Sequence, residues 1–242
     1  PIGFAGEVDP AAYARAVLDA ALRVNNNPRP FYFLHMKTSA KEMPDVPLWH
    51  VDKAKGRAVA SIIGCAGDWF GATGFDTANP DLFITEDLRG GRLPAVLEKE
   101  LPCILVGHWP CFYANDQIGF KVLKEVKRRL DAFDPDRTKT LWMKNSEIGH
   151  YWMARTLSDI RVETGAAPDQ ERLRVETKFP THNFTLMLDT AAKRVKVDSG
   201  DLRPAKSRRD FRAGTFLVEG GRTFVAFDLA TGTTTVTVWR DS

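Results

Sequence analysis

CILVGHW, residues 103–109, is a short apolar run with a histidine near its end, and FYFLHM, residues 31–36, has the same form. A nearly continuous apolar stretch is typical of a buried strand in a parallel sheet, because helices cover both faces of such a sheet. In α/β folds the reacting groups lie at the carboxyl ends of these strands. The two runs therefore predict buried strands that bring His35 and His108 to one edge of a sheet. The alternative is that each histidine is only hydrogen-bonded structure.

The first half of the chain alternates between strand-like and helix-like segments. Apolar side chains recur at helical spacing over residues 9–24, 92–100, 116–130 and 146–157. Further short strands are expected in RAVASIIGCAGDW from residue 57, PDLFITEDL from residue 80 and TLWMK from residue 140. This alternation predicts an α/β domain over residues 1–160, built as a partial or complete (β/α) barrel.

After residue 160 the apolar pattern changes to strict alternation, which is typical of strands with one solvated face. The alternating segments are RLRVETKF, NFTLMLDT, KRVKVDS, GTFLVEGG, RTFVAFDLA and TTTVTVWR. Gly220-Gly221 and Thr231-Gly232 stand where tight hairpin turns need residues that tolerate positive φ. The sequence therefore predicts a small antiparallel β-sandwich over residues 161–242, after a linker at GAAPD.

Composition argues against several classes of function. The chain is 43% hydrophobic and 27% charged, as in an ordinary globular protein, and its net charge of +3 is too small to indicate a nucleic acid partner. No apolar run approaches the roughly 20 residues that cross a bilayer, so no membrane span is expected. The sequence contains no P-loop, GxSxG or HExxH motif, which disfavours nucleotide-dependent and serine-hydrolase chemistry.

Polar and aromatic residues follow the predicted strands. His35, Asp68 and His108 are the candidate catalytic residues, because imidazoles with a carboxylate can transfer protons or bind a divalent metal. Asp68 in a Gly-rich loop is alternatively a turn former, and Asn115 before a helix is alternatively an N-cap. Flat rings beside polar groups suit the faces of sugars. The candidate substrate-binding residues are Trp69, Trp109, Tyr113 and Asn115.

CILVGHWPCFYANDQIGFKVLKEVKRRL and LWMKNSEIGHYWMAR resemble the closing part of the polysaccharide-deacetylase-like superfamily, over residues 31–160. The resemblance implies a (β/α) barrel in which His108 is the general acid toward the leaving sugar. It also implies a divalent metal, expected to be zinc, which is held by one Asp and two His and activates water. The chain has no His-x-x-x-His and no paired aspartates that end a first strand. We expect these elements either upstream of residue 1 or lost in this branch.

Three functions follow from these observations. The leading hypothesis is a carbohydrate-active, hydrolase-like protein that deacetylates or hydrolyses a polysaccharide or oligosaccharide. The alternative, favoured by the missing metal motif, is a non-catalytic glycan-binding or structural module derived from the same fold. A third hypothesis is a metal-independent hydrolase that uses carboxylates among Asp68, Asp76 and Glu86.

Overall fold

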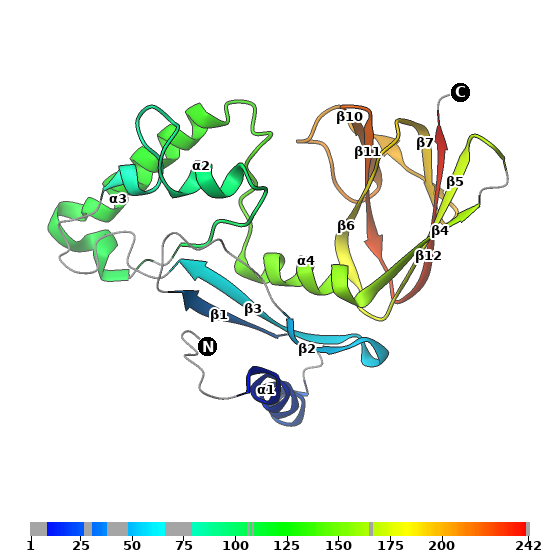
Figure 1. The fold of residues 1–242 in the computed structure, drawn as a ribbon, viewed down its shortest axis with the longest axis horizontal. Helices are drawn as coiled ribbons and strands as arrows, with labels where there is room; N and C mark the ends of the chain where they lie inside the picture. Colours follow the sequence, from blue (N-terminus) through cyan, green and yellow to red (C-terminus); the bar gives the residue numbers. More distant parts are fainter. Residues whose placement is uncertain are drawn as a thin grey trace. The chain divides into compact units, whose positions relative to one another are not determined.

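The computed structural model describes residues 9–26, 31–37, 48–65, 79–105, 107, 109–164 and 167–240. Its helices are α1 (Pro10–Asn25), η1 (Lys53–Lys55), η2 (Pro80–Leu82), α2 (Arg92–Leu97), α3 (Trp109–Phe133) and α4 (Asn145–Leu157), of which η1 and η2 are single 3₁₀ turns (Figure 1). Its strands are β1 (Phe31–Lys37), β2 (Leu48–Asp52), β3 (Arg57–Cys65), β4 (Ser158–Thr164), β5 (Gln170–Thr177), β6 (Thr181–Leu188), β7 (Ala192–Val197), β8 (Gly200–Asp201), β9 (Arg203–Pro204), β10 (Thr215–Glu219), β11 (Arg222–Leu229) and β12 (Gly232–Arg240).

The predicted fold class, a (β/α) barrel followed by a small antiparallel β-sandwich, is wrong. The described residues are mainly β-structure in three sheets, with strand orders β1-β3-β2, β6-β11-β10-β9 and β4-β5-β12-β7-β8. Before residue 158 the described strands are only β1, β2 and β3, too few to close a barrel. The superfamily resemblance implied the same barrel, so its fold expectation is corrected with it.

Three of the predicted strands account for this error. Residues 80–88 form η2 and turns, and residues 140–144 have no regular structure. In CILVGHW the described residues hold an isolated bridge at Leu105 instead of a strand, although Ile104 is buried. An apolar run indicates burial without fixing the backbone conformation, and here the side chains enter a core from irregular segments.

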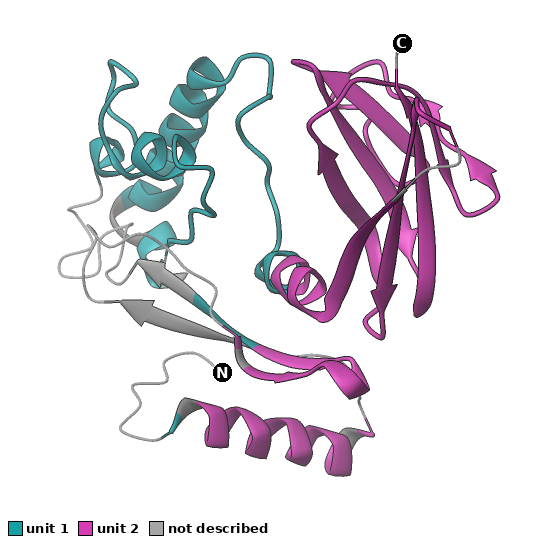
Figure 2. Cartoon of the chain, turned by 45° about the vertical axis from the view of Figure 1, so that its right-hand side comes forward, with its two compact units in different colours: residues 1–10, 32–47, 60–149 teal, residues 11–31, 48–59, 150–242 magenta. Residues whose placement is uncertain are grey.

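The chain divides into two compact units that are interleaved in sequence (Figure 2). Unit 1 consists of residues 1–10, 32–47 and 60–149, and unit 2 consists of residues 11–31, 48–59 and 150–242. The division runs through β3 and α4. Each unit is therefore assembled from segments that lie far apart in the sequence.

Unit 1 is organised around α3, which bends sharply. Asp116 and Gln117 have φ values of 55° and 60°, so the helix is interrupted by left-handed backbone at these residues. The ring of Phe120 lies 5.2 Å from that of Phe112, whereas eight residues of straight helix span about 12 Å. The break folds the first turns of α3 back onto the rest. Side chains from both parts and from the segment after η2 form the core of this unit, namely Phe83, Ile84, Cys111, Val122 and Val126.

Unit 2 contains the four- and five-stranded sheets, which face each other in Figure 1. Their strand pairings are antiparallel except for the parallel pair β9–β10. Alternate side chains are buried, as the alternating sequence predicts. The buried apolar residues of these sheets include Leu173, Val175, Val195, Val236 and Val238 on one and Phe184, Leu186, Val225 and Phe227 on the other.

The turn between β2 and β3 packs on the connection from β5 to β6. Gly56 adopts a left-handed conformation with φ +61°, and a Cβ at this position would lie 2.3 Å from the carbonyl oxygen of Lys178. Lys178 Nζ donates to the carbonyl oxygen of Ala54 at 2.8 Å, and Lys53 forms an ion pair with Asp159 at 2.8 Å. Residues 53–56 are thereby attached to the β-rich part of unit 2.

Candidate functional site

The described residues leave the predicted catalytic group untested. Of the predicted catalytic residues, His35 lies in β1. Of the predicted sugar-binding residues, Trp109 and Asn115 lie in α3. Only the backbone is described for these three residues. Four predicted site residues lie outside the described ranges, namely Asp68, Trp69, Asp76 and His108. Tyr113 and Glu86 are described with their side chains. A common cleft for His35 and His108 therefore stays a prediction.

Tyr113 lies in the first turns of α3. Its side chain is 53% exposed, and its ring meets Phe120 edge to face at 5.2 Å between centroids. Part of the ring is used to hold the bend in α3, and the rest faces solvent. Its predicted role in sugar binding stays a prediction.

The described residues contain no group of three His, Cys, Asp or Glu side chains placed to hold a metal ion. Glu147 and His150, which lie three residues apart on α4, have structural partners. Glu147 accepts a hydrogen bond from the backbone N–H of Lys144 at 2.6 Å. The His150 ring packs on Phe179, with 4.7 Å between centroids, and its Nε2 lies 3.4 Å from the carbonyl oxygen of Pro180.

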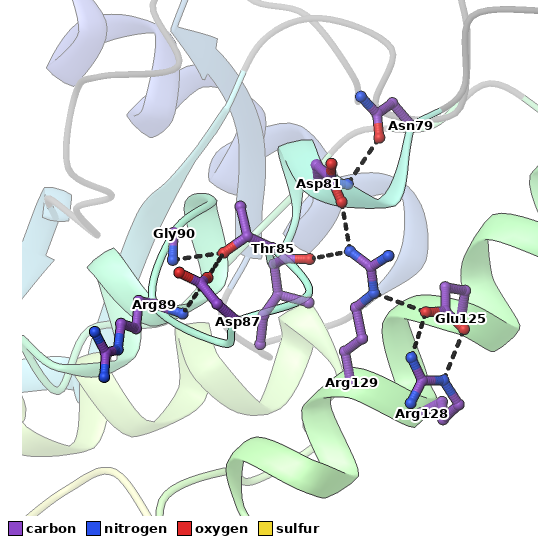
Figure 3. A network of polar contacts seen from close by, with 10 residues as sticks. Asn79, Asp81, Thr85, Asp87, Arg89, Gly90, Glu125, Arg128 and Arg129 are labelled. Carbon is purple, nitrogen blue, oxygen red and sulfur yellow. Dashed lines mark hydrogen bonds and ion pairs between the residues drawn. The ribbon is translucent and has the colours of Figure 1, made fainter.

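The most connected polar group in unit 1 surrounds Arg129 on α3 (Figure 3). Its Nη1 donates to Asp81 at 2.5 Å and to the carbonyl oxygen of Ile84 at 2.9 Å, and its Nε donates to Glu125 at 2.7 Å. Hydrogen bonds from Arg128 and Arg129 lower the pKa of Glu125 to about 2. These side chains hydrogen-bond to one another, so the group ties η2 to α3.

A second set of hydrogen bonds closes the turn that follows. Thr85 Oγ1 donates to Asp87 at 2.5 Å and accepts from the backbone N–H of Gly90 at 2.7 Å (Figure 3). Asp87 also accepts from the backbone N–H of Arg89. Glu86, a predicted candidate carboxylate, is exposed on this turn. The turn is a structural arrangement of local hydrogen bonds.

A concave surface lies on the five-stranded sheet of unit 2. It has a volume of about 410 Å³ and is formed by β5, β12, β7 and the residue after β7. We call it the sheet depression. Its lining residues are Gln170, Arg172, Lys196, Asp198, Thr235, Thr237 and Trp239.

Strand register explains the shape of the sheet depression. Thr237 on β12 pairs with Arg172 on β5 and with Lys196 on β7, so these three side chains form one row across the sheet. Their neighbours along the strands, among them Val236 and Val238, point into the core. Short threonine side chains therefore make the floor, and two long cationic side chains stand on either side of it.

Trp239 closes one end of the sheet depression. It pairs with Gln170 on one side and with Arg194 on the other. The Arg194 guanidinium lies over the indole ring at 4.7 Å and is itself held by Asp201, with Nε to Oδ1 at 2.8 Å. Arg194 does not line the sheet depression. It therefore covers one face of the indole, while Trp239 itself lines the sheet depression.

Asp198 lies at the other end and is held by the backbone of β12. Its Oδ1 accepts from the N–H of Thr235 at 2.8 Å, and its own N–H donates to the carbonyl oxygen of Thr235 at 2.7 Å. The residue has a φ of 49°, which Asp tolerates better than most residues. The carboxylate is thus fixed in position, with acceptor capacity beyond these bonds.

The two cations that line the sheet depression differ from their neighbours. Arg172 Nε is buried and has no hydrogen-bond partner among the described residues. No ion pair joins Arg172 or Lys196 to a carboxylate of the described chain. Four other cations of the same sheet do form ion pairs: Arg174 with Glu176, Lys193 with Asp169, Arg194 with Asp201 and Arg240 with Glu171.

Sequence reasoning missed the sheet depression. The alternation in RLRVETKF and TTTVTVWR places Arg172, Thr237 and Trp239 at solvent-facing positions, which was a usable signal. However, the alternation does not reveal that β12 lies between β5 and β7. That pairing is what gathers the lining residues.

Comparison with protein-family models, curated proteins and solved structures gives no match to this chain. Among the described helices, none has both the length and the apolar character needed to span a membrane.

Proposed function

We propose that unit 2 is a glycan-binding module and that the sheet depression is its binding surface. The observation that carries this proposal is Trp239 at the end of an open, polar depression of about 410 Å³. Small-ligand sites commonly have volumes of about 300–1,000 Å³ and combine an apolar surface with a few placed polar groups. An indole offers the apolar surface against which a sugar ring stacks.

The polar lining supports the same proposal. Gln170 and Asp198 provide hydrogen-bond acceptors at the two ends, and Thr235 and Thr237 provide hydroxyls along the floor. Sugar hydroxyl groups both donate and accept, so this mixture suits them. Trp239 and Asp198 are also held in place by neighbours, which lowers the entropy lost when a ligand binds.

The predicted deacetylase-like or hydrolytic activity is not part of this proposal. Of the residues assigned to it, Asp68 and His108 lie outside the described ranges, and no side chain is described for His35. The divalent metal that it requires likewise stays a prediction. Glycan binding without turnover was the alternative hypothesis, and the geometry of unit 2 favours it.

Binding by the full chain tests the proposal. An oligosaccharide array would identify ligands, and titration calorimetry would give their dissociation constants. We expect Trp239→Ala to weaken binding about tenfold or more, which is the lower end of the roughly 1–3 kcal/mol that a nucleic-acid base gains by stacking on an aromatic side chain, taken here as the scale for a stacked sugar ring. Trp239→Phe should restore part of the affinity.

Trp142→Ala is the matched control, because Trp142 is 72% exposed and belongs to unit 1. It should leave the dissociation constant unchanged. Near-ultraviolet circular dichroism would establish that both variants are folded. Equal weakening by the two substitutions, or no binding of any glycan by the unmodified chain, would exclude the sheet depression as a glycan site.

A further inference from the structure

We infer that the sugar bound in the sheet depression is acidic, with an anionic substituent held between Arg172 and Lys196. This inference rests on the proposed function and adds the chemical class of the ligand. The shared chemistry is a carboxylate or a sulfate ester on the sugar ring.

The first observation is the state of Arg172. Its Nε is removed from solvent and makes no hydrogen bond among the described residues. Leaving a buried donor unsatisfied is unfavourable, and the cost is larger for a charged group than for a neutral one. Glu163 on β4 pairs with Arg172 in the strand register, yet no ion pair joins them. No carboxylate of the described chain therefore forms an ion pair with this guanidinium, and Arg172 lines the sheet depression.

The second observation is the contrast with nearby cations. On the same strand, Arg174 lies two residues away and is neutralised by Glu176 at 2.5 Å. Arg194, two residues before Lys196, is neutralised by Asp201. Arg172 and Lys196 form no ion pair of this kind, although Lys196 lies opposite Asp201 in the strand register. Arg161 on β4 also forms no ion pair among the described residues, but it does not line the sheet depression. The two cations that line the sheet depression therefore keep capacity for an anionic ligand.

The third observation is spacing. Arg172 and Lys196 flank Thr237 on the two adjacent strands, and neighbouring strands lie about 4.8 Å apart. The two backbones are thus separated by about 10 Å across the short threonine side chain, because two strand spacings lie between them. An anionic group above Thr237 would be within reach of both cations, and its sugar ring would extend toward Trp239. A guanidinium matches the paired oxygens of a carboxylate or sulfate.

The negative groups nearby leave this arrangement intact. Asp201 accepts from Arg194 and lies opposite Lys196 in the strand register, and Asp198 is anchored to the backbone of Thr235 at the opposite end from Trp239. Asp198 is suited to accept hydrogen bonds from sugar hydroxyls. It also gives the sheet depression a polarity that fixes the direction of the bound sugar.

Calorimetry with three oligosaccharides of equal length tests the inference: a neutral one, a uronic acid oligomer and a sulfated neutral one. We expect one acidic ligand to bind at least tenfold more tightly than the neutral ligand at low salt. That preference should shrink as ionic strength rises, because salt screens exposed charges. The acidic ligand that binds more tightly identifies the anion.

Arg172→Gln and Lys196→Gln should each abolish most of this preference, because each variant should weaken binding of the acidic ligand more than binding of the neutral ligand. Arg174→Gln is the matched control, on the same strand and paired with Glu176, and it should retain the preference. Equal affinity for neutral and acidic ligands would overturn the inference and leave glycan binding standing. Equal loss of both affinities in the Arg172 and Lys196 variants would also overturn it. Absence of binding to all three ligands, together with a negative array, would instead overturn the proposed function.

Discussion

Arg129 illustrates how a single side chain can organise a unit without taking part in chemistry. Its side chain is only 10% exposed. It joins Asp81 and the carbonyl oxygen of Ile84 to α3. Asp134, at the end of α3, acts in a similar way. Its carboxylate accepts from the backbone N–H groups of Thr138, Lys139 and Thr140 and from the Thr140 hydroxyl. This carboxylate is the centre of the turn at residues 134–140.

We expect Arg129→Met to lower the free energy of unfolding by about 1–3 kcal/mol, because it leaves the Ile84 carbonyl and the Asp81 carboxylate without this donor. Arg128→Met is the control, since Arg128 shares Glu125 but is exposed, and exposed ion pairs contribute little. Urea unfolding of both variants provides the comparison. Equal losses would show that the Arg129 group does not hold η2 to α3.

At the scale of elements, the turn between β2 and β3 depends on close backbone approach at Gly56. Gly220 has nearly the same backbone, with φ +59° against +61°, but an added Cβ would meet no atom within 4 Å there. Alanine substitutions at the two glycines therefore distinguish the energetic cost of left-handed backbone from the cost of a steric collision.

Gly220→Ala should cost about 1–2 kcal/mol, the price of placing a Cβ on left-handed backbone. Gly56→Ala should cost distinctly more, because the new Cβ also collides with the carbonyl of Lys178. Thermal and urea unfolding of the two variants would measure the difference. Similar losses would mean that the β2–β3 turn moves away from residue 178 without penalty.

Sequence periodicity predicted some of these elements well. Helices at α1 and α4, the strands β1 and β3, and the strands β5, β6, β7, β10, β11 and β12 follow from helical spacing, apolar runs or alternation, whereas the two-residue strands β8 and β9 were not predicted. The spacing over 116–130 predicted most of α3, and the left-handed break at Asp116 lies where that expected helix begins. The strand β2 was missed because LWHVD is short and follows prolines.

The errors and omissions have one physical origin. Ile84 and Ile104 are buried apolar residues, but burial in an irregular segment gives the same sequence pattern as burial in a strand. Likewise, the solvent-facing residues of β5, β7 and β12 were readable, whereas their adjacency was not. Long-range pairing is set by the whole fold, so the row of Arg172, Thr237 and Lys196 emerges only from the structure.

For the whole molecule, carboxylates with lowered pKa values predict sensitivity to acid. Hydrogen bonds from Arg128 and Arg129 lower the pKa of Glu125 from 4.5 to about 2. Burial alone would raise the pKa of Asp134, but hydrogen bonds from Thr140, Thr138 and Lys139 outweigh it and lower that pKa. The folded chain thus binds these protons less tightly than the unfolded chain. Their stabilisation is complete above the unfolded pKa values and is lost as the pH falls through the folded ones.

We therefore expect the melting temperature to decline as the pH drops from about 4.5 toward 2, the interval between the unfolded and folded pKa values of Glu125. Glu125→Gln should melt below the unmodified chain at neutral pH, and the two curves should converge near pH 2. Scanning calorimetry across this range provides the measurement. A constant difference between the two proteins down to pH 2 would contradict this role for Glu125.

The order of the strands also has a consequence for how the protein is made. β12, which lies between β5 and β7, comes after every other strand in the chain. During synthesis, β5 and β7 cannot pair with β12 until residues 232–240 have left the ribosome. Co-translational folding of the face that carries the sheet depression is thus postponed until the end of this stretch, and a nascent chain halted before residue 232 would present two unpaired strand edges to other proteins.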